Sequence, residues 1–88
     1  METIDYSKKT ISQLAFAIEA DWNKGGKRVH PYALPYLEAM GCLNKISDNY
    51  GADTGESVVA YFLGNAKTWK GETAKEIKKE LNKRLKAA

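Results

Sequence analysis

The sequence has few of the residues from which cross-links and metal sites are built. It contains one cysteine, Cys42, and one histidine, His30, among 88 residues. One cysteine cannot form an internal disulfide, and the two residues together fall short of the three or four ligands of a zinc site. We therefore expect a fold held by packing alone, without a metal or other cofactor, in a reducing compartment such as the cytoplasm.

Long apolar segments are also missing. No apolar run approaches the roughly 18 residues that cross a membrane. The first residues, Met1–Asp5, include two acids and none of the apolar stretch of a secretory signal. Hydrophobic residues make up 43% of the chain and charged residues 28%, which is typical of a globular protein. We expect one domain over residues 1–88 and no membrane partner.

No segment alternates between apolar and polar residues over a useful length, so we expect no sheet. Apolar residues instead recur every three to four positions, which is typical of amphipathic helices. The sequence predicts an all-α fold, a compact single-domain bundle of about four helices over 10–24, 34–50, 54–70 and 72–86. Residues 1–9 are expected to form a loose N-terminal arm.

Local signals place the ends of these helices. Thr10 and Gln13 fit a capping box at the start of the first helix. Gly51 is the expected C-cap of the second helix, whose apolar face includes Leu43. Asp53, with Glu56 three residues later, is the expected cap of the third helix. The third helix is the most apolar, and we expect it to be central, with one stripe formed by Val58, Phe62, Ala66 and Trp69.

Three short patterns resemble reactive sites but lack the partners that the chemistry needs. Asp53-Thr54-Gly55 is the triplet of aspartic proteases, yet it precedes a helical pattern rather than following a strand. The segment 48–53 has acids and a glycine, but its spacing fails that of a calcium loop. Cys42 falls within a predicted helix, where we expect a buried and inert thiol. We therefore expect a protein that is not an enzyme and has no catalytic residues.

The positive charge is concentrated in the last quarter of the chain. Residues 67–88 carry eight basic and three acidic side chains, whereas residues 1–66 carry six basic and eight acidic ones. Such asymmetry fits a surface for an anionic partner, and it also fits a solvated helix face with cations near the helix C-terminus. The candidate residues for an anionic partner are Lys67, Lys70, Lys75, Lys78, Lys79, Lys83 and Lys86.

Two aromatic residues lie off the apolar stripes of their helices. Phe16 points about 140° away from the Ile11 stripe at 100° per residue, and Tyr61 leaves the main stripe of the third helix. Aromatic residues are enriched in protein interfaces, so Phe16 and Tyr61 are candidates for a protein-binding surface. The alternative is that a central helix buries more than one of its faces.

Three segments of the chain resemble a known group of proteins. The segments lie at 32–40, 48–53 and 61–71, and the letters that carry the resemblance are YAxPYLxAM, DxYGAD and YFLxNAxTWKG, where x is any residue. Over about residues 10–85 the chain is similar to small uncharacterised proteins of prophages and conjugative elements of Gram-positive bacteria. This group has no catalytic motif and no assigned activity, so the resemblance implies only a cytoplasmic accessory protein of a mobile element.

These observations together favour a small, non-enzymatic helical accessory protein that binds a protein partner. The alternative is a nucleic-acid-binding protein that uses the basic C-terminal helix. The sequence leaves open whether the chain forms a homodimer.

Overall fold

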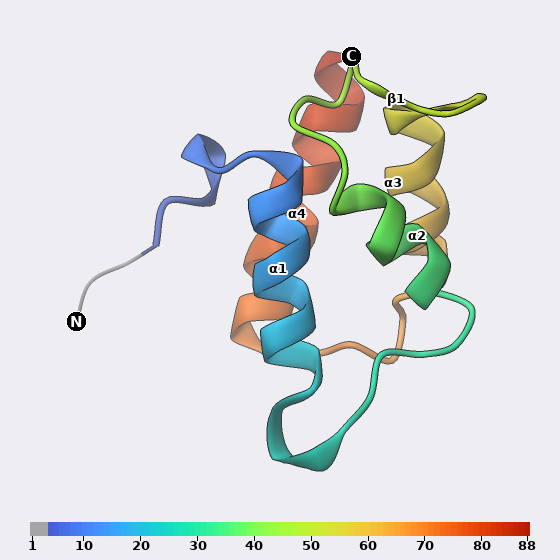
Figure 1. Ribbon diagram of the computed structural model, residues 1–88. Coiled ribbons are helices and arrows are strands. Elements are labelled where there is room, and N and C mark those ends of the chain that lie inside the picture. Colours follow the sequence, from blue (N-terminus) through green and yellow to red (C-terminus); the bar gives the residue numbers. More distant parts are fainter. Residues whose placement is uncertain (1–3) are drawn as a thin grey trace.

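The computed structural model describes residues 4–88 and folds mainly into helices (Figure 1). Its elements are η1 (Tyr6–Lys8), α1 (Ile11–Trp22), η2 (Lys24–Gly26), α2 (Leu34–Met40), β1 (Asn49–Tyr50), β2 (Asp53–Thr54), α3 (Gly55–Gly64) and α4 (Glu72–Ala87). The predicted compact four-helix fold is confirmed. The expectation of no sheet is wrong, because β1 and β2 form a short hairpin.

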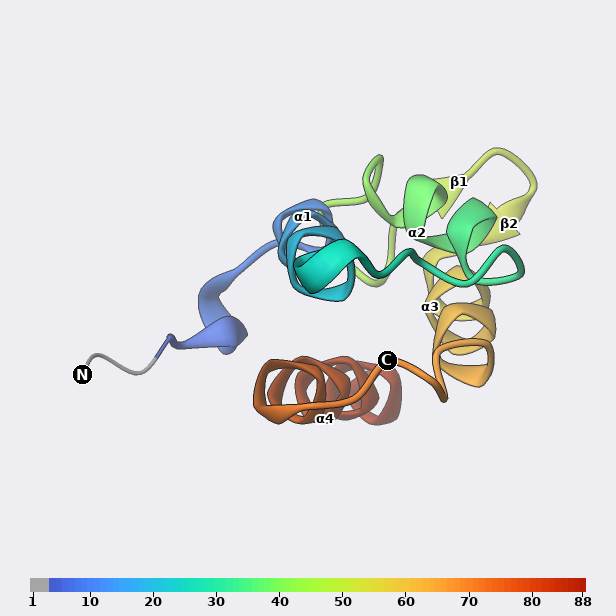
Figure 2. The same cartoon turned by 90° about the horizontal axis from the view of Figure 1, so that it is seen from below.

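The four α-helices form a ring in which each packs against two others. Helix α1 packs on α2 and α4, and α3 packs on the same two helices, so α1 and α3 lie across the bundle from each other (Figure 2). Helix α3 is therefore not the central helix that its apolar sequence predicts. The core between the helices contains only apolar side chains among the described residues.

Helix α1 follows its sequence signals closely. The Gln13 N–H donates to Thr10 Oγ1 at 3.1 Å, and the Thr10 N–H donates to Gln13 Oε1 at 2.9 Å. The predicted capping box is thus present. The predicted apolar stripe is also buried; its members are Ile11, Leu14, Ala15, Ile18 and Trp22.

Helix α2 ends at Met40, ten residues before the predicted end at residue 50. The chain beyond it supplies carbonyl groups to the start of α1: Leu43 O accepts from the Ser12 N–H at 2.7 Å, and Asn44 O accepts from the Ile11 N–H at 3.0 Å. These carbonyls would be occupied within a continued helix. Leu43 is still fully buried, as its place on the predicted apolar face suggested.

The hairpin occupies the segment where the second helix was expected to end. Asn49 pairs with Thr54 and Tyr50 with Asp53, and Gly51 stands in the turn with a φ of +60° rather than at a helix C-cap. Asp53 is therefore a strand residue. The cap of α3 is Thr54, whose hydroxyl accepts from the Ser57 N–H at 3.1 Å.

Helix α3 ends at Gly64, so the predicted helix over 54–70 is six residues too long. Ala66 and Trp69, predicted as its buried stripe, are buried from the following loop instead. Their carbonyl oxygens accept hydrogen bonds from Lys78 Nζ at 2.7 and 2.6 Å. A loop can offer both carbonyls to one ammonium group, whereas a continued helix would use the Ala66 carbonyl internally.

Helix α4 matches its prediction to within one residue and buries Ala74, Ile77 and Leu81. It also holds the N-terminal segment. The Arg84 guanidinium donates to the carbonyls of Tyr6 at 3.0 Å and Lys9 at 2.7 Å. Residues 4–9 of the expected loose arm thus contain η1 and contact α4, and residues 1–3 lie outside the described part.

Candidate functional site

Phe16 is the most exposed large apolar side chain among the described residues. It is 79% exposed, on the outer face of α1. It borders a hollow of about 370 Å³, which we call the Phe16 hollow and which is lined by Ile4, Tyr6, Lys9, Gln13, Phe16 and Ala17. The predicted exposure of Phe16 is therefore confirmed, and the hollow gives it apolar neighbours.

The position of the N-terminal segment creates one wall of this hollow. Asp5 caps η1 by accepting the N–H of Ser7 at 3.1 Å, and this bonding, led by the Ser7 hydroxyl, lowers the pKa of Asp5. Arg84 fixes the same segment through its carbonyls, and Glu80 Oε2 accepts from Arg84 Nε at 2.6 Å. The wall is thus anchored to α4 by hydrogen bonds.

Sequence reasoning missed the contribution of Ile4 and Tyr6 to this surface. Ile4 is 57% exposed, and Tyr6 packs partly against the core. The signal was present as two apolar side chains within the otherwise polar segment 2–9. It carried no helical period, so it could not be assigned to a face.

The opposite side of Phe16 faces a groove between α1 and α2. This groove is lined by Ser12, Ala15, Phe16, Glu19, Leu37, Glu38 and Gly41. Phe16 thus stands between an apolar hollow with Lys9 on its edge and a groove with two glutamates. The surface is therefore asymmetric, with a lysine on one side of the Phe16 ring and two glutamates on the other.

Tyr61 is exposed as well, but on a different part of the molecule. Its ring is 59% exposed and stacks on Tyr36 with 5.5 Å between the ring centroids. Helices α1 and α3 lie across the bundle from each other (Figure 2). The structure therefore does not bring Tyr61 together with Phe16 on one surface.

The seven candidate lysines separate into distinct groups. Lys75, Lys79, Lys83 and Lys86 are exposed on α4, and Lys67 is exposed on the loop after α3. Lys78 is half-buried, with its ammonium directed to the carbonyls of the loop before α4 and 5.6 Å from the Trp69 ring centroid. Burial and the Lys70 ammonium lower the pKa of Lys78. Lys78 thus joins two parts of the fold rather than facing a partner.

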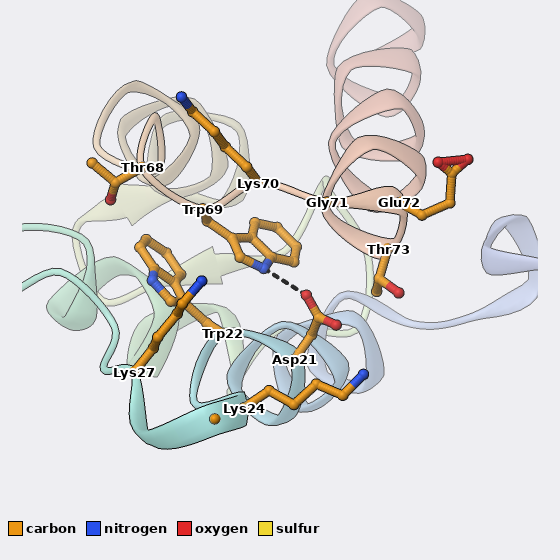
Figure 3. A pocket seen from close by; sticks show the side chains of 11 residues that line it. Asp21, Trp22, Lys24, Lys27, Thr68, Trp69, Lys70, Gly71, Glu72 and Thr73 are labelled. Carbon is orange, nitrogen blue, oxygen red and sulfur yellow. Dashed lines mark hydrogen bonds between the residues drawn. The ribbon is translucent and has the colours of Figure 1, made fainter.

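Lys70 lies at the end of the bundle where the loop that contains residue 25 meets the loop that contains residue 70. There it lines a hollow of about 500 Å³, which we call the tryptophan hollow, together with Trp22, Trp69, Lys24 and Lys27 (Figure 3). The sequence did not indicate that these three lysines would share one hollow, because Lys24 and Lys27 come from a distant loop.

The floor of the tryptophan hollow is closed. The two indole rings stack at 5.8 Å and are only 5% and 2% exposed, and Trp69 Nε1–H donates to Asp21 Oδ2 at 2.9 Å (Figure 3). No ring face is free to stack on a ligand. Asp21 and Glu72 also line the hollow and offset most of the charge of its three lysines.

The residues of the patterns that resembled reactive sites lie in turns, in the hairpin and at the start of α3. Asp48 accepts the N–H groups of Asn44 and Lys45, each at 3.0 Å, and so closes a turn. His30 Nδ1 accepts the Tyr32 N–H at 3.2 Å. Cys42 is exposed in the turn after α2, so the expectation of a buried thiol within a helix is wrong. Residues 4–88 contain no cluster of three potential metal ligands among His, Cys, Asp and Glu.

Comparisons of the chain with protein-family models, with curated proteins and with solved structures find no match. Among residues 4–88, no helix combines the length and the apolar character needed to cross a membrane.

Proposed function

We propose that this protein is a non-enzymatic binding protein whose Phe16 hollow receives a segment of a protein partner. The observation that carries the proposal is the 79% exposure of Phe16 beside a hollow with apolar walls. Exposed apolar surface of this kind, with polar residues at its rim, is typical of protein-interaction sites. The role of a cytoplasmic accessory protein of a mobile element, which the resemblance implies, belongs to the same proposal.

The Phe16 surface fits a partner better than the Tyr61 surface does. Tyr61 already contacts another aromatic ring and keeps a hydroxyl group for water. Phe16 has no polar atom in its side chain, and its neighbours Ile4 and Ala17 extend the apolar area. Covering Phe16 therefore removes more apolar surface from water per residue, at about 25 cal/mol per Å².

The charges around Phe16 indicate which charges a complementary partner segment carries. Lys9 lies on the hollow side, and Glu19 and Glu38 lie on the groove side. A complementary segment has an apolar anchor for the hollow, an acidic residue on one side of that anchor and a basic residue on the other. The anchor supplies most of the affinity, and the two charges set the direction of binding.

A peptide-display selection tests this assignment. The wild-type chain is the bait, and Phe16→Asp is used to remove peptides that bind elsewhere. We expect the selected peptides to share an apolar anchor with charges of opposite sign on its two sides. Their affinity should fall at least tenfold for Phe16→Ala, which corresponds to about 1.4 kcal/mol. Tyr61→Ala is the matched control on the other surface and should keep full affinity.

Two results would contradict the proposal. One is a set of peptides without a shared anchor, or with equal affinity for wild type and Phe16→Ala. The other is self-association of the wild type that Phe16→Ala abolishes, measured by sedimentation, because Phe16 would then bind a second copy of this chain.

A further inference from the structure

Four exposed lysines form a continuous strip along α4. At 100° per residue, Lys75, Lys79, Lys83 and Lys86 fall within an arc of about 80°. They extend about 16 Å along the helix at 1.5 Å per residue. Asn82 lies in the same strip, and a shallow hollow is lined only by Lys79, Asn82, Lys83 and Lys86. We call these four lysines the lysine strip.

The acids of α4 neutralise this strip less than the sequence suggests. The sequence offers several Glu–Lys and Glu–Arg pairs at helix spacing, yet the one ion pair within residues 4–88 joins Glu80 to Arg84. Both side chains of that pair are largely buried beside the N-terminal segment. Asp5 and Glu76 border Lys79 and Lys83 on one flank, without an ion pair to either lysine. Within residues 4–88, none of the four ammonium groups of the strip forms an ion pair.

We infer that the lysine strip binds the phosphate backbone of duplex DNA without reading its sequence. This inference uses a surface other than the Phe16 hollow and does not depend on it. Lysines neutralise phosphates as point charges and thereby release counterions. The strip is on the outer side of α4, which lies along one edge of the molecule (Figure 2).

The composition of the strip favours nucleic acid over other anionic surfaces. Lysine is depleted in protein interfaces, and helix α4 has no exposed large apolar side chain that could enter a membrane surface. No exposed aromatic residue lies on α4 either, so the strip offers no stacking surface for the bases of a single strand.

The width of the major groove favours B-form DNA over an RNA duplex as the partner of helix α4. The major groove of B-form DNA is wide enough to admit an α-helix, whereas the major groove of A-form RNA is deep and narrow. Sequence reading is not expected, because lysine is the only basic residue in the strip and the Asn82 amide donates to the Lys78 carbonyl at 2.9 Å. Contacts to phosphate hold a protein on DNA but carry no sequence information.

Fluorescence anisotropy with a labelled 20-base-pair DNA duplex tests the inference. We expect binding at low salt with a log–log salt slope of about −3 to −4, since each neutralised phosphate contributes about −0.9. Affinity should fall about 100-fold when salt rises from about 50 to about 200 mM, as four such contacts require. Duplexes of different sequence should bind equally.

Two variants with the same change of net charge separate the strip from general attraction. The first replaces the strip and carries Lys75→Gln, Lys79→Gln, Lys83→Gln and Lys86→Gln. The control carries Lys24→Gln, Lys27→Gln, Lys67→Gln and Lys70→Gln. The strip variant should lose at least 30-fold in affinity and most of its salt slope, while the control should lose less than threefold. A strip variant with four Lys→Arg changes should keep its affinity, and circular dichroism checks that each variant folds.

Four outcomes would overturn the inference. The wild type fails to bind duplex DNA at about 20 mM salt, where electrostatic binding is strongest. The two glutamine variants lose affinity equally. Single-stranded DNA or duplex RNA binds more tightly than duplex DNA. Vesicles of anionic lipid bind while DNA does not.

Discussion

The two connections that join α3 to the rest of the bundle are stabilised in different ways. The connection before α3, residues 41–54, is mostly exposed. Leu43 is buried and the Leu43 and Asn44 carbonyls accept from the start of α1, but the side-chain hydrogen bonds are local, such as those that the Asp48 carboxylate accepts from Asn44 and Lys45. The connection after it, residues 65–71, buries Ala66 and Trp69 and is held by side chains from other helices.

This difference shows how two loops of one small protein can depend on different parts of the sequence. The side-chain hydrogen bonds of the first connection join residues within a few positions of one another. The second needs Asp21, which lies 48 positions before Trp69, and Lys78 on the following helix. We therefore expect substitutions in the second connection to affect the whole core and most substitutions in the first to have local effects.

The largest expected effect comes from Trp69→Ala. This change removes a ring that is 2% exposed and stacked on Trp22, and it leaves Asp21 without its indole donor. It should lower the free energy of unfolding by about 3–5 kcal/mol, measured by urea denaturation followed by circular dichroism. A domain of this size has a free energy of unfolding of about 4–13 kcal/mol, so the change removes a large fraction of it.

Tyr50→Ala is the matched aromatic change in the first connection. Tyr50 is 45% exposed in the hairpin, so its removal should change the free energy of unfolding by no more than about 0.5 kcal/mol. Equal losses for Trp69→Ala and Tyr50→Ala would remove the distinction between the two connections.

The next effect tests the tightest backbone approach to the first connection, which Gly55 at the start of α3 makes to residues 46–48. A Cβ atom at Gly55 would lie 2.6 Å from the Ile46 carbonyl oxygen and 2.7 Å from the Asp48 carbonyl oxygen. Both contacts are to backbone, so Gly55→Ala must displace the chain and should destabilise the fold by about 2–3 kcal/mol in the same denaturation assay.

Gly64 at the other end of α3 provides the control. A Cβ there meets nothing within 4 Å, and its φ is not positive. Gly64→Ala should therefore stabilise the protein by up to about 1 kcal/mol through helix propensity. A neutral Gly55→Ala would mean that residues 46–48 move freely, and the first connection would then be looser than the structure indicates.

Lys78→Met should have a smaller effect in the second connection. The change removes the two hydrogen bonds to the Ala66 and Trp69 carbonyls while keeping an apolar stem of similar length. The expected loss is about 1–2 kcal/mol, because carbonyls near the core lose a charged donor. Lys79→Met alters the next residue, which is exposed, and should stay within about 0.5 kcal/mol. Equal unfolding midpoints for the two variants would show that Lys78 is not needed there.

These connections also explain which parts of the fold could be predicted from the sequence. Helix α1 was predicted well because both its capping box and its apolar stripe are local features. The ends of α2 and α3 were wrong because partners far along the chain decide them. The Leu43 and Asn44 carbonyls accept hydrogen bonds from N–H groups at the start of α1. Lys78 Nζ donates to carbonyls of the loop after α3. Apolar spacing still identified Leu43, Ala66 and Trp69 as core residues, since burial depends less on exact backbone conformation.

The candidate site could be predicted only in part for the same reason. Helical spacing showed that Phe16 and Tyr61 leave their stripes, and both are exposed. It could not show that the two residues lie on different surfaces, which depends on the ring order of the helices. Nor could it show that Arg84 fixes the segment carrying Ile4 and Tyr6 beside Phe16, because that contact joins the two ends of the described chain.

The smallest expected effect is a pH dependence in the first connection. The N–H groups of Lys45 and Asn44 lower the pKa of Asp48 below the ordinary value of 3.8. A carboxyl group with a lowered pKa in the folded state stabilises the fold fully above its unfolded pKa, and this contribution is lost as the pH falls through the folded pKa. The thermal midpoint of the wild type should therefore exceed that of Asp48→Asn at neutral pH, and the two should converge as the pH falls below the lowered pKa of Asp48. Trp69→Phe is the control from the second connection: it removes the hydrogen bond that Trp69 Nε1–H donates to Asp21 Oδ2 and leaves the Asp48 turn unchanged, so its difference from wild type should not follow the protonation of Asp48. A gap between wild type and Asp48→Asn that persists unchanged at low pH would show that the turn depends on the shape of residue 48 rather than on its charge.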